Sequence, residues 1–147
     1  MAVTRSSKFR FALVVSVFNR EYTDALLASA RAALKGHELK VVRVPGAYEI
    51  PLQAQRLART KRYAAVIALG VIWQGKTLHA QEILRAVTAA LMRISLETDV
   101  PVIHEVLAVA NEAEARARCM GAKLNRGNEA AQAALALALQ DVAKGTR

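Results

Sequence analysis

One apolar run that leads directly into a glycine-containing turn constrains the fold of this chain most. Residues 64–69 are all Ala, Val, Ile or Leu, as is typical of a strand buried on both faces of a sheet. Gly75-Lys76-Thr77 follows, and a helix is predicted to begin there with Thr77 as its N-cap. Free N–H groups at the start of that helix favour an anion, and His79 would lie in its first turn. The stretch therefore indicates a small-molecule reaction on a phosphorylated or otherwise anionic substrate.

Strands and helices are predicted to alternate along the rest of the chain, because apolar residues recur first without a break and then at helical spacing. The run at 64–69 opens one strand, and the others are expected at 9–18, 39–44 and 102–109. Helices are expected at 21–35, 49–59, 78–96 and 112–120, with a last helix that ends before Gly145. This order is typical of an α/β fold in which a parallel sheet is covered by helices on both faces. We expect one domain over residues 9–147 after a flexible tail at 1–8.

Composition limits the setting and the partners of the protein. The single cysteine, Cys119, excludes an internal disulfide and any recognisable zinc spacing, which favours a reducing, cytoplasmic location. No run approaches the ~18 apolar residues of a membrane-spanning helix. The net charge of +9 makes nucleic acid a possible partner, but the basic residues are scattered and no aromatic residues interleave with them. We therefore expect no nucleic-acid partner and no membrane partner.

Chemically distinctive residues fall at the predicted carboxyl ends of the strands, where parallel α/β folds bind ligands. Phe18 follows the first strand and Glu49 follows the second, while His79 comes after the third. Each has a structural alternative: Phe18 could complete the core, Glu49 could be an ordinary acid at a helix N-terminus, and His79 could be a solvent-exposed helical residue. Glu82, three residues after His79, could orient its imidazole. ATP binding is weakly supported, because the turn lacks the full pattern of a nucleotide-binding loop.

Several motifs in register resemble the 6,7-dimethyl-8-ribityllumazine synthase family. The resemblance covers residues 9–140 and is carried by Val44-Pro45-Gly46-Ala47-Tyr48-Glu49-Ile50-Pro51, Leu69-Gly70 with Gly75-x-Thr77-x-His79, Ser95-Leu96-Glu97-Thr98, Val100-Pro101-Val102-Ile103, and Asn125-Arg126-Gly127 before Glu129-Ala130-Ala131. It implies a flavodoxin-like, three-layer α/β/α fold with a four-stranded parallel sheet. It also implies condensation of 5-amino-6-ribitylaminouracil with 3,4-dihydroxy-2-butanone 4-phosphate in riboflavin biosynthesis, without a metal or an organic cofactor.

The resemblance assigns roles to individual residues. His79 would transfer protons, and Phe18 would stack on the pyrimidine. The ribityl chain would contact Ala47, Tyr48 and Glu49, and the phosphate would be held by Gly75, Lys76, Thr77 and Arg118. The family builds its sites between neighbouring subunits, so we expect a homo-oligomer: a pentamer, a decamer or a sixty-subunit shell.

The chain also departs from the family pattern close to these positions. Gln74 stands where an arginine is usual, Lys76 where a small residue is usual, and Ala80-Gln81 where an aromatic-acid pair is usual. His104-Glu105 replaces a Phe-Gly-like pair, and Ala108 replaces a hydroxyl residue. An alternative therefore stays open: a diverged paralogue that binds lumazine or flavin, or that condenses a different amine and carbonyl.

Overall fold

A computed structural model describes residues 7–145 as an alternation of strands and helices around one sheet. The elements in chain order are β1 (Arg10–Ser16), α1 (Arg20–Ala33), β2 (Glu38–Val44), a short 3₁₀ turn (Ala47–Glu49), α2 (Ile50–Arg59), β3 (Ala65–Trp73), α3 (His79–Thr98), β4 (Val102–Val109), α4 (Glu112–Cys119) and α5 (Arg126–Ala143). The predicted order of elements is confirmed. Their ends differ from the predicted ends by a few residues.

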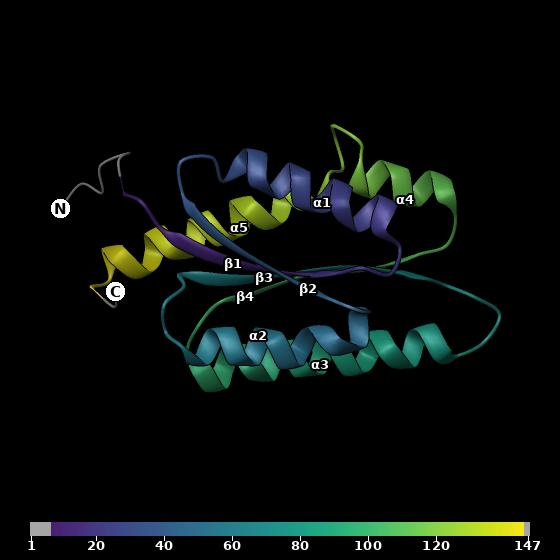
Figure 1. The fold of residues 1–147 in the computed structure, drawn as a ribbon, viewed down its shortest axis with the longest axis horizontal. Helices are drawn as coiled ribbons and strands as arrows, with labels where there is room; N and C mark the ends of the chain where they lie inside the picture. Colours follow the sequence, from purple (N-terminus) through teal and green to yellow (C-terminus); the bar gives the residue numbers. More distant parts are fainter. Residues whose placement is uncertain (1–6, 146–147) are drawn as a thin grey trace.

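The sheet is parallel throughout, with strand order β2-β1-β3-β4. Figure 1 shows α1, α4 and α5 on one face of the sheet and α2 and α3 on the other. The predicted flavodoxin-like, three-layer α/β/α fold is thus confirmed. Because all four strands run in the same direction, their carboxyl ends share one edge, and the turns that follow β1, β2 and β3 meet there.

Two apolar clusters, one on each face of the sheet, form the core. The central strands β1 and β3 contribute to both clusters, since alternate side chains of a strand point to opposite faces. Residues 65–69 are fully buried, as the unbroken apolar run predicts. On β4, Leu107 and Val109 join the cluster under α1, α4 and α5, whereas Val106 joins the cluster under α2 and α3.

The start of α3 differs from the sequence prediction. The helix begins at His79, its N-cap is Leu78, and no side chain caps it, so the prediction that Thr77 is the N-cap is wrong. Leu78 already has helical backbone angles, which places Thr77 one position too early to reach the free N–H groups of the first turn. These N–H groups therefore lack a side-chain partner within the helix cap.

The first strand is shorter than predicted, because it ends at Ser16. Two further backbone bonds continue the contact with the end of β2 and the residue after it: Val17 N donates to Val44 O at 2.8 Å and Phe18 N donates to Pro45 O at 2.9 Å. Asn19 then turns the chain with left-handed backbone angles (φ 62°, ψ 42°). The predicted tail at 1–8 lies mostly outside the described residues, and both the tail and the single domain at 9–147 stay predictions.

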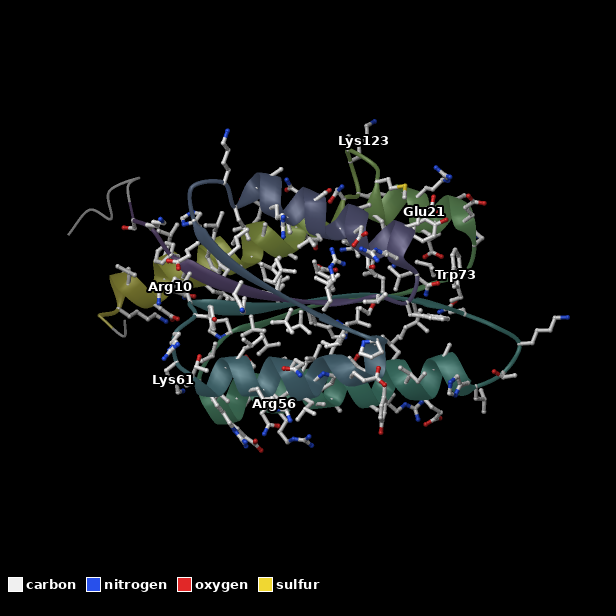
Figure 2. All side chains as sticks on the ribbon, in the orientation of Figure 1. Arg10, Glu21, Arg56, Lys61, Trp73 and Lys123 are labelled. Atoms are coloured by element: carbon white, nitrogen blue, oxygen red, sulfur yellow. The ribbon has the colours of Figure 1, made fainter. Side chains whose placement is uncertain are left out.

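Two of the basic side chains, Arg10 and Lys61, lie at the end of the molecule away from the carboxyl edge of the sheet (Figure 2). Figure 2 shows Arg10 and Lys61 at the opposite end from Trp73, which closes β3. Arg10 pairs with Glu38 at 2.9 Å, and both side chains are more than half exposed. Exposed ion pairs of this kind contribute roughly 0–1 kcal/mol to the free energy of unfolding, so they do not determine the fold.

Candidate functional site

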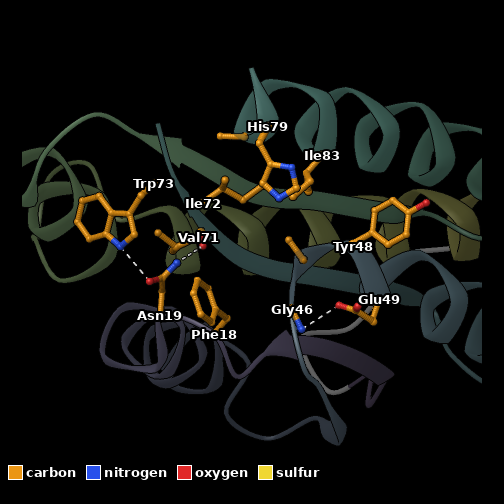
Figure 3. A pocket seen from close by; sticks show the side chains of 12 residues that line it. Phe18, Asn19, Gly46, Tyr48, Glu49, Val71, Ile72, Trp73, His79 and Ile83 are labelled. Carbon is orange, nitrogen blue, oxygen red and sulfur yellow. Dashed lines mark hydrogen bonds between the residues drawn. The ribbon is translucent and has the colours of Figure 1, made fainter. Parts of the chain in front are cut away.

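A cavity of about 610 Å³ opens at the carboxyl edge of the sheet, between the β1–α1 turn, the turn after β2, the end of β3 and the start of α3. Its lining includes five of the residues that the sequence singled out, namely Phe18, Ala47, Tyr48, Glu49 and His79. Figure 3 shows His79 across the cavity from Phe18 and Glu49. Residues from three separate turns therefore meet around one space large enough for a small organic molecule.

Two aromatic rings stand on the rim of this cavity instead of filling the core. The side chains of Phe18 and Tyr48 are 70% and 66% exposed. This removes the alternative in which Phe18 completes the core. A flat ring held at the mouth of a cavity offers a stacking surface for a planar ligand.

A hydrogen-bonded bridge fixes the turn that carries Phe18. Asn19 donates from Nδ2 to the carbonyl of Val71 at 2.6 Å and accepts at Oδ1 from Trp73 Nε1 at 2.9 Å. The indole also meets the ring of Tyr22 edge-on, with centroids 5.6 Å apart. The left-handed geometry of Asn19 thus directs its amide to β3, and the bridge ties the β1–α1 turn to the strand below the cavity.

Glu49 stabilises its own turn and also faces the cavity. Its carboxylate accepts a hydrogen bond from the backbone N–H of Gly46 at 3.0 Å. The structural alternative for Glu49, an acid at the N-terminal end of a helix, is therefore compatible with a position in the lining. The same contact holds the 46–49 turn against the cavity.

His79 is the first residue of α3, and its side chain is exposed towards the cavity. Among residues 7–145 no hydrogen bond joins Glu82 to His79, so the suggested orientation of the imidazole by Glu82 stays a prediction. Glu82 lies instead 4.0 Å from Arg85, one turn further along the helix. His79 can therefore reorient to meet a bound ligand.

A second, more polar hollow of about 310 Å³ adjoins the cavity and shares Ala80 with it. It is lined by Gln74, Gly75, Lys76, Thr77, Leu78, Ala80 and Gln81. The uncapped N-terminus of α3 follows this turn, and residues 75–78 are exposed, so the first N–H groups and the positive end of the helix dipole can meet an anion. A Cβ built on Gly75 would meet nothing within 4 Å, so the glycine leaves open space for a ligand against the backbone.

Arg118 is the one predicted phosphate residue that lines neither hollow. It lies on α4, which covers the opposite face of the sheet from α3, as Figure 1 shows. Its guanidinium pairs with Glu114 at 3.0 Å, and both side chains are about one third exposed. Within one chain the structure does not bring Arg118 to His79.

The substituted pair His104-Glu105 lies on the edge strand β4, with the two side chains on opposite faces. His104 Nδ1 accepts a hydrogen bond from Val106 N at 3.1 Å, and Nε2 lies 2.7 Å from Thr88 Oγ1 on α3. Burial lowers the pKa of His104. A neutral ring with its proton on Nε2 satisfies both contacts.

Sequence reasoning missed part of the cavity lining. Trp73, Ile72 and Ile83 line the cavity beside the predicted residues. The signal for Trp73 was present, since it is the only tryptophan and ends the buried strand. Ile72 and Ile83 carry no such signal, because isoleucines in a strand and in a helix are expected in the core.

Other site types find no support in the described part of the chain. Over residues 7–145, no three His, Cys, Asp or Glu side chains are grouped so that they could hold a metal ion. None of the helices described there is long and apolar enough to cross a bilayer. The fold and the cavity thus define a parallel α/β protein with a small-molecule site at the carboxyl edge of its sheet.

Comparison with known proteins identifies the family. The sequence model of the 6,7-dimethyl-8-ribityllumazine synthase family matches residues 8–141, and the chain belongs to that family. Proteins named 6,7-dimethyl-8-ribityllumazine synthase from Xanthomonas euvesicatoria pv. vesicatoria (strain 85-10) and Xanthomonas campestris pv. campestris (strain B100) are 41% and 42% identical, each over 90% of both chains. The protein of that name from Stenotrophomonas maltophilia (strain R551-3) is 42% identical over 86% of this chain and 84% of its own.

Proposed function

We propose that this protein condenses 5-amino-6-ribitylaminouracil with 3,4-dihydroxy-2-butanone 4-phosphate to give 6,7-dimethyl-8-ribityllumazine, two molecules of water and phosphate. The observation that carries the proposal is the cavity in which an exposed aromatic ring, a histidine and an adjoining polar turn meet at one edge of the sheet. The family membership and the names of the relatives support the same reaction and do not favour a diverged paralogue.

Different residues of the cavity bind the uracil substrate and transfer protons. Phe18 stacks on the pyrimidine, while the turn formed by Ala47, Tyr48 and Glu49 contacts the ribityl chain. The 5-amino group attacks the butanone carbonyl, and a first water leaves as the imine forms. Phosphate is then eliminated, and the ribityl-bearing nitrogen closes the ring on the remaining carbonyl with loss of a second water. His79 moves protons in these steps, since an imidazole can act in both directions near neutral pH.

The phosphate is held by the polar hollow at the start of α3. Gly75 and Lys76 line this hollow and would offer backbone N–H groups, Thr77 has a hydroxyl that caps no helix, and Lys76 adds a positive charge. This arrangement anchors the butanone substrate next to His79 and then stabilises the phosphate as it leaves. Two substrates held side by side react as if at high local concentration.

A mixing experiment with the two substrates tests the function directly. We expect the absorbance and fluorescence of the lumazine to appear faster than in the uncatalysed background when the purified protein is added. Absence of any acceleration would contradict the proposed function. If the uracil or riboflavin bound without turnover, the diverged paralogue would be the better interpretation.

The protein acts as a homo-oligomer in this proposal, a pentamer or a larger assembly of pentamers. Arg118 lies across the sheet from His79 in one chain, so it can bind the phosphate only in a site completed by a neighbouring copy. Exposed apolar side chains support self-association: Met92 and Leu96, one turn apart on α3, are 62% and 75% exposed. Apolar groups this open to water favour burial against another surface.

Complementation between two inactive variants tests the shared site. His79→Ala and Arg118→Ala are each expected to lose most of the turnover, whereas oligomers reassembled from both variants should recover part of it. A neighbour that supplies Arg118 to a subunit with intact His79 restores a complete site. Mass photometry should show at least a pentamer; a monomer at working concentration, or no recovery in verified mixed oligomers, would contradict the arrangement.

A cytoplasmic location completes the proposal. The only cysteine, Cys119, is fully buried, and burial raises the pKa of its thiol to about 11. Such a thiol stays protonated and unreactive. Because a single buried cysteine forms no disulfide within the chain, an oxidising compartment would not stabilise this protein.

A further inference from the structure

The cavity opens where the two central strands of the sheet stop pairing. The parallel pairing of β1 with β3 ends with Val15 opposite Leu69. Beyond that point β3 continues to Trp73, still paired with β4, whereas β1 ends at Ser16 and the chain turns into α1. The β1–α1 turn and the last residues of β3 therefore line the cavity from two sides, with no strand pairing between them.

The side chain of Asn19 connects these two sides. Its Nδ2 donates to Val71 O at 2.6 Å, and its Oδ1 accepts from Trp73 Nε1 at 2.9 Å, as the dashed lines in Figure 3 mark. A carbonyl oxygen only accepts hydrogen bonds and an indole N–H only donates them, so one orientation of the amide satisfies both partners. The indole N–H thus fixes how the Asn19 amide is directed, and with it the place of the neighbouring Phe18.

The backbone of the same turn is held independently of this amide. Phe18 N donates to Pro45 O at 2.9 Å, which attaches the turn to the segment after β2. The carbonyl of Asn19 accepts from Tyr22 N at 3.0 Å and from Thr23 N at 3.1 Å, which attaches it to α1. None of these three bonds reaches β3. Loss of the amide bridge is therefore expected to leave the fold in place and to free the Phe18 side of the cavity from β3.

The indole of Trp73 is supported by a second element. The ring of Tyr22, which is buried on α1, meets the indole edge-on, with centroids 5.6 Å apart and ring planes at 81°. Trp73 itself is 37% exposed and lines the cavity. A hydrogen bond that is open to water contributes little to the free energy of unfolding, so we expect the Trp73–Asn19 bond to affect the cavity more than the fold.

We propose that Trp73 is a positioning residue for the side of the cavity that binds the planar part of the substrate: through the Asn19 amide it sets the distance between the Phe18 ring and β3. The inference rests on the proposed stacking role of Phe18 and adds the residue that places this ring. A ring that is held in place before binding loses less conformational freedom when the ligand arrives, so the affinity for a planar ligand is higher. The polar hollow after β3 shares only Ala80 with the cavity, so binding of the phosphate does not depend on the bridge.

Removal of the indole N–H tests this role. Trp73→Phe keeps an aromatic ring next to Tyr22 and removes the donor to Asn19. Riboflavin is a suitable probe, because it carries a planar ring and a ribityl chain but no phosphate. Titration calorimetry of the assembled protein should give a riboflavin affinity roughly two- to tenfold weaker in the variant, the usual effect of one lost hydrogen bond. In turnover, KM for the uracil should rise by a similar factor, whereas kcat and KM for the butanone phosphate should stay close to wild-type values.

A second variant tests whether Trp73 acts through the amide. Asn19→Gly removes the amide and keeps the left-handed turn at little cost, because glycine adopts positive φ freely. It should weaken riboflavin binding at least as much as Trp73→Phe, and the double variant should bind no more weakly than Asn19→Gly alone. Independent contacts of the two side chains with the ligand would instead multiply the two losses. Tyr22→Phe keeps both the edge-on ring contact and the bridge, so this matched control should bind riboflavin like the wild type.

The outcomes distinguish this inference from the proposed function. Wild-type affinity in Trp73→Phe, multiplied losses in the double variant, or no riboflavin binding by the wild type would overturn the role of Trp73. An equal rise in KM for both substrates would also overturn it, because a general disturbance of the fold has that effect. If lumazine forms but Trp73→Phe binds riboflavin and the uracil like the wild type, the function stands and the inference fails. If riboflavin binding weakens as expected but no lumazine forms, the placement of the Phe18 ring by Trp73 stands without the proposed reaction.

Discussion

Replacement of His79 by alanine is expected to lower kcat for lumazine formation by about 10²- to 10⁴-fold, the usual contribution of a positioned acid–base group. The imidazole is exposed towards the cavity at the first residue of α3, and its removal leaves no other histidine in the lining. Substrate affinity should change less, because Phe18 and the turn at 75–77 remain. Initial rates at saturating substrate, corrected for the uncatalysed background, measure the loss.

A second histidine provides the matched control for this variant. His37 stacks on Phe9 and accepts a hydrogen bond from its backbone N–H at 3.1 Å, at the start of β2 and thus at the opposite end of the sheet from the cavity. His37→Gln should leave kcat unchanged. If His79→Ala retained wild-type turnover, proton transfer would have to be assigned to water or to another group.

Gly127→Ala is expected to destabilise the fold by about 3 kcal/mol or more, at the upper end of the range for overpacking. A Cβ at this position would stand 2.3 Å from the carbonyl oxygen of Leu26, so α5 could not stay as close to α1. The obstacle is a backbone atom within a helix, which cannot rotate aside as a flexible side chain can. Thermal or urea unfolding of the variant measures the effect.

Gly75→Ala is the matched control for stability. The same chemical change there meets nothing within 4 Å, so the melting temperature should stay close to that of the wild type. If Gly127→Ala were as stable as Gly75→Ala, the close contact of α1 and α5 would have to relax at little cost. The comparison therefore measures how rigidly the helix layer above the sheet is packed.

Local pattern predicted most of the elements correctly because their causes are local. Residues 65–69 of the apolar run became the fully buried first part of β3. Asn111 caps α4 by accepting from the N–H of Glu114 at 2.8 Å. Alternating apolar segments led to the parallel sheet with helices on both faces. The prediction failed at Thr77, because the helix begins at His79, one residue later than predicted, and its N-cap is Leu78.

The candidate site was predictable in part. Phe18, Glu49 and His79 follow successive strands of a parallel sheet, so their meeting at one edge follows from the fold class. The amide bridge from Asn19 to Trp73 was not predictable, because it joins residues 54 positions apart through a left-handed turn. Ile72 and Ile83 were also not predictable as lining residues, since their burial depends on which turn lies opposite.

The sequence by itself determined the strand and helix order and, through several motifs in register, the family, since both depend on residue types at short, fixed spacings. Only the tertiary structure decided which of the predicted residues share a cavity, because that depends on how the layers pack. It placed Arg118 on α4, on the opposite face of the sheet from α3, which carries His79. Distances between elements arise from the folded arrangement, so no local pattern carries them.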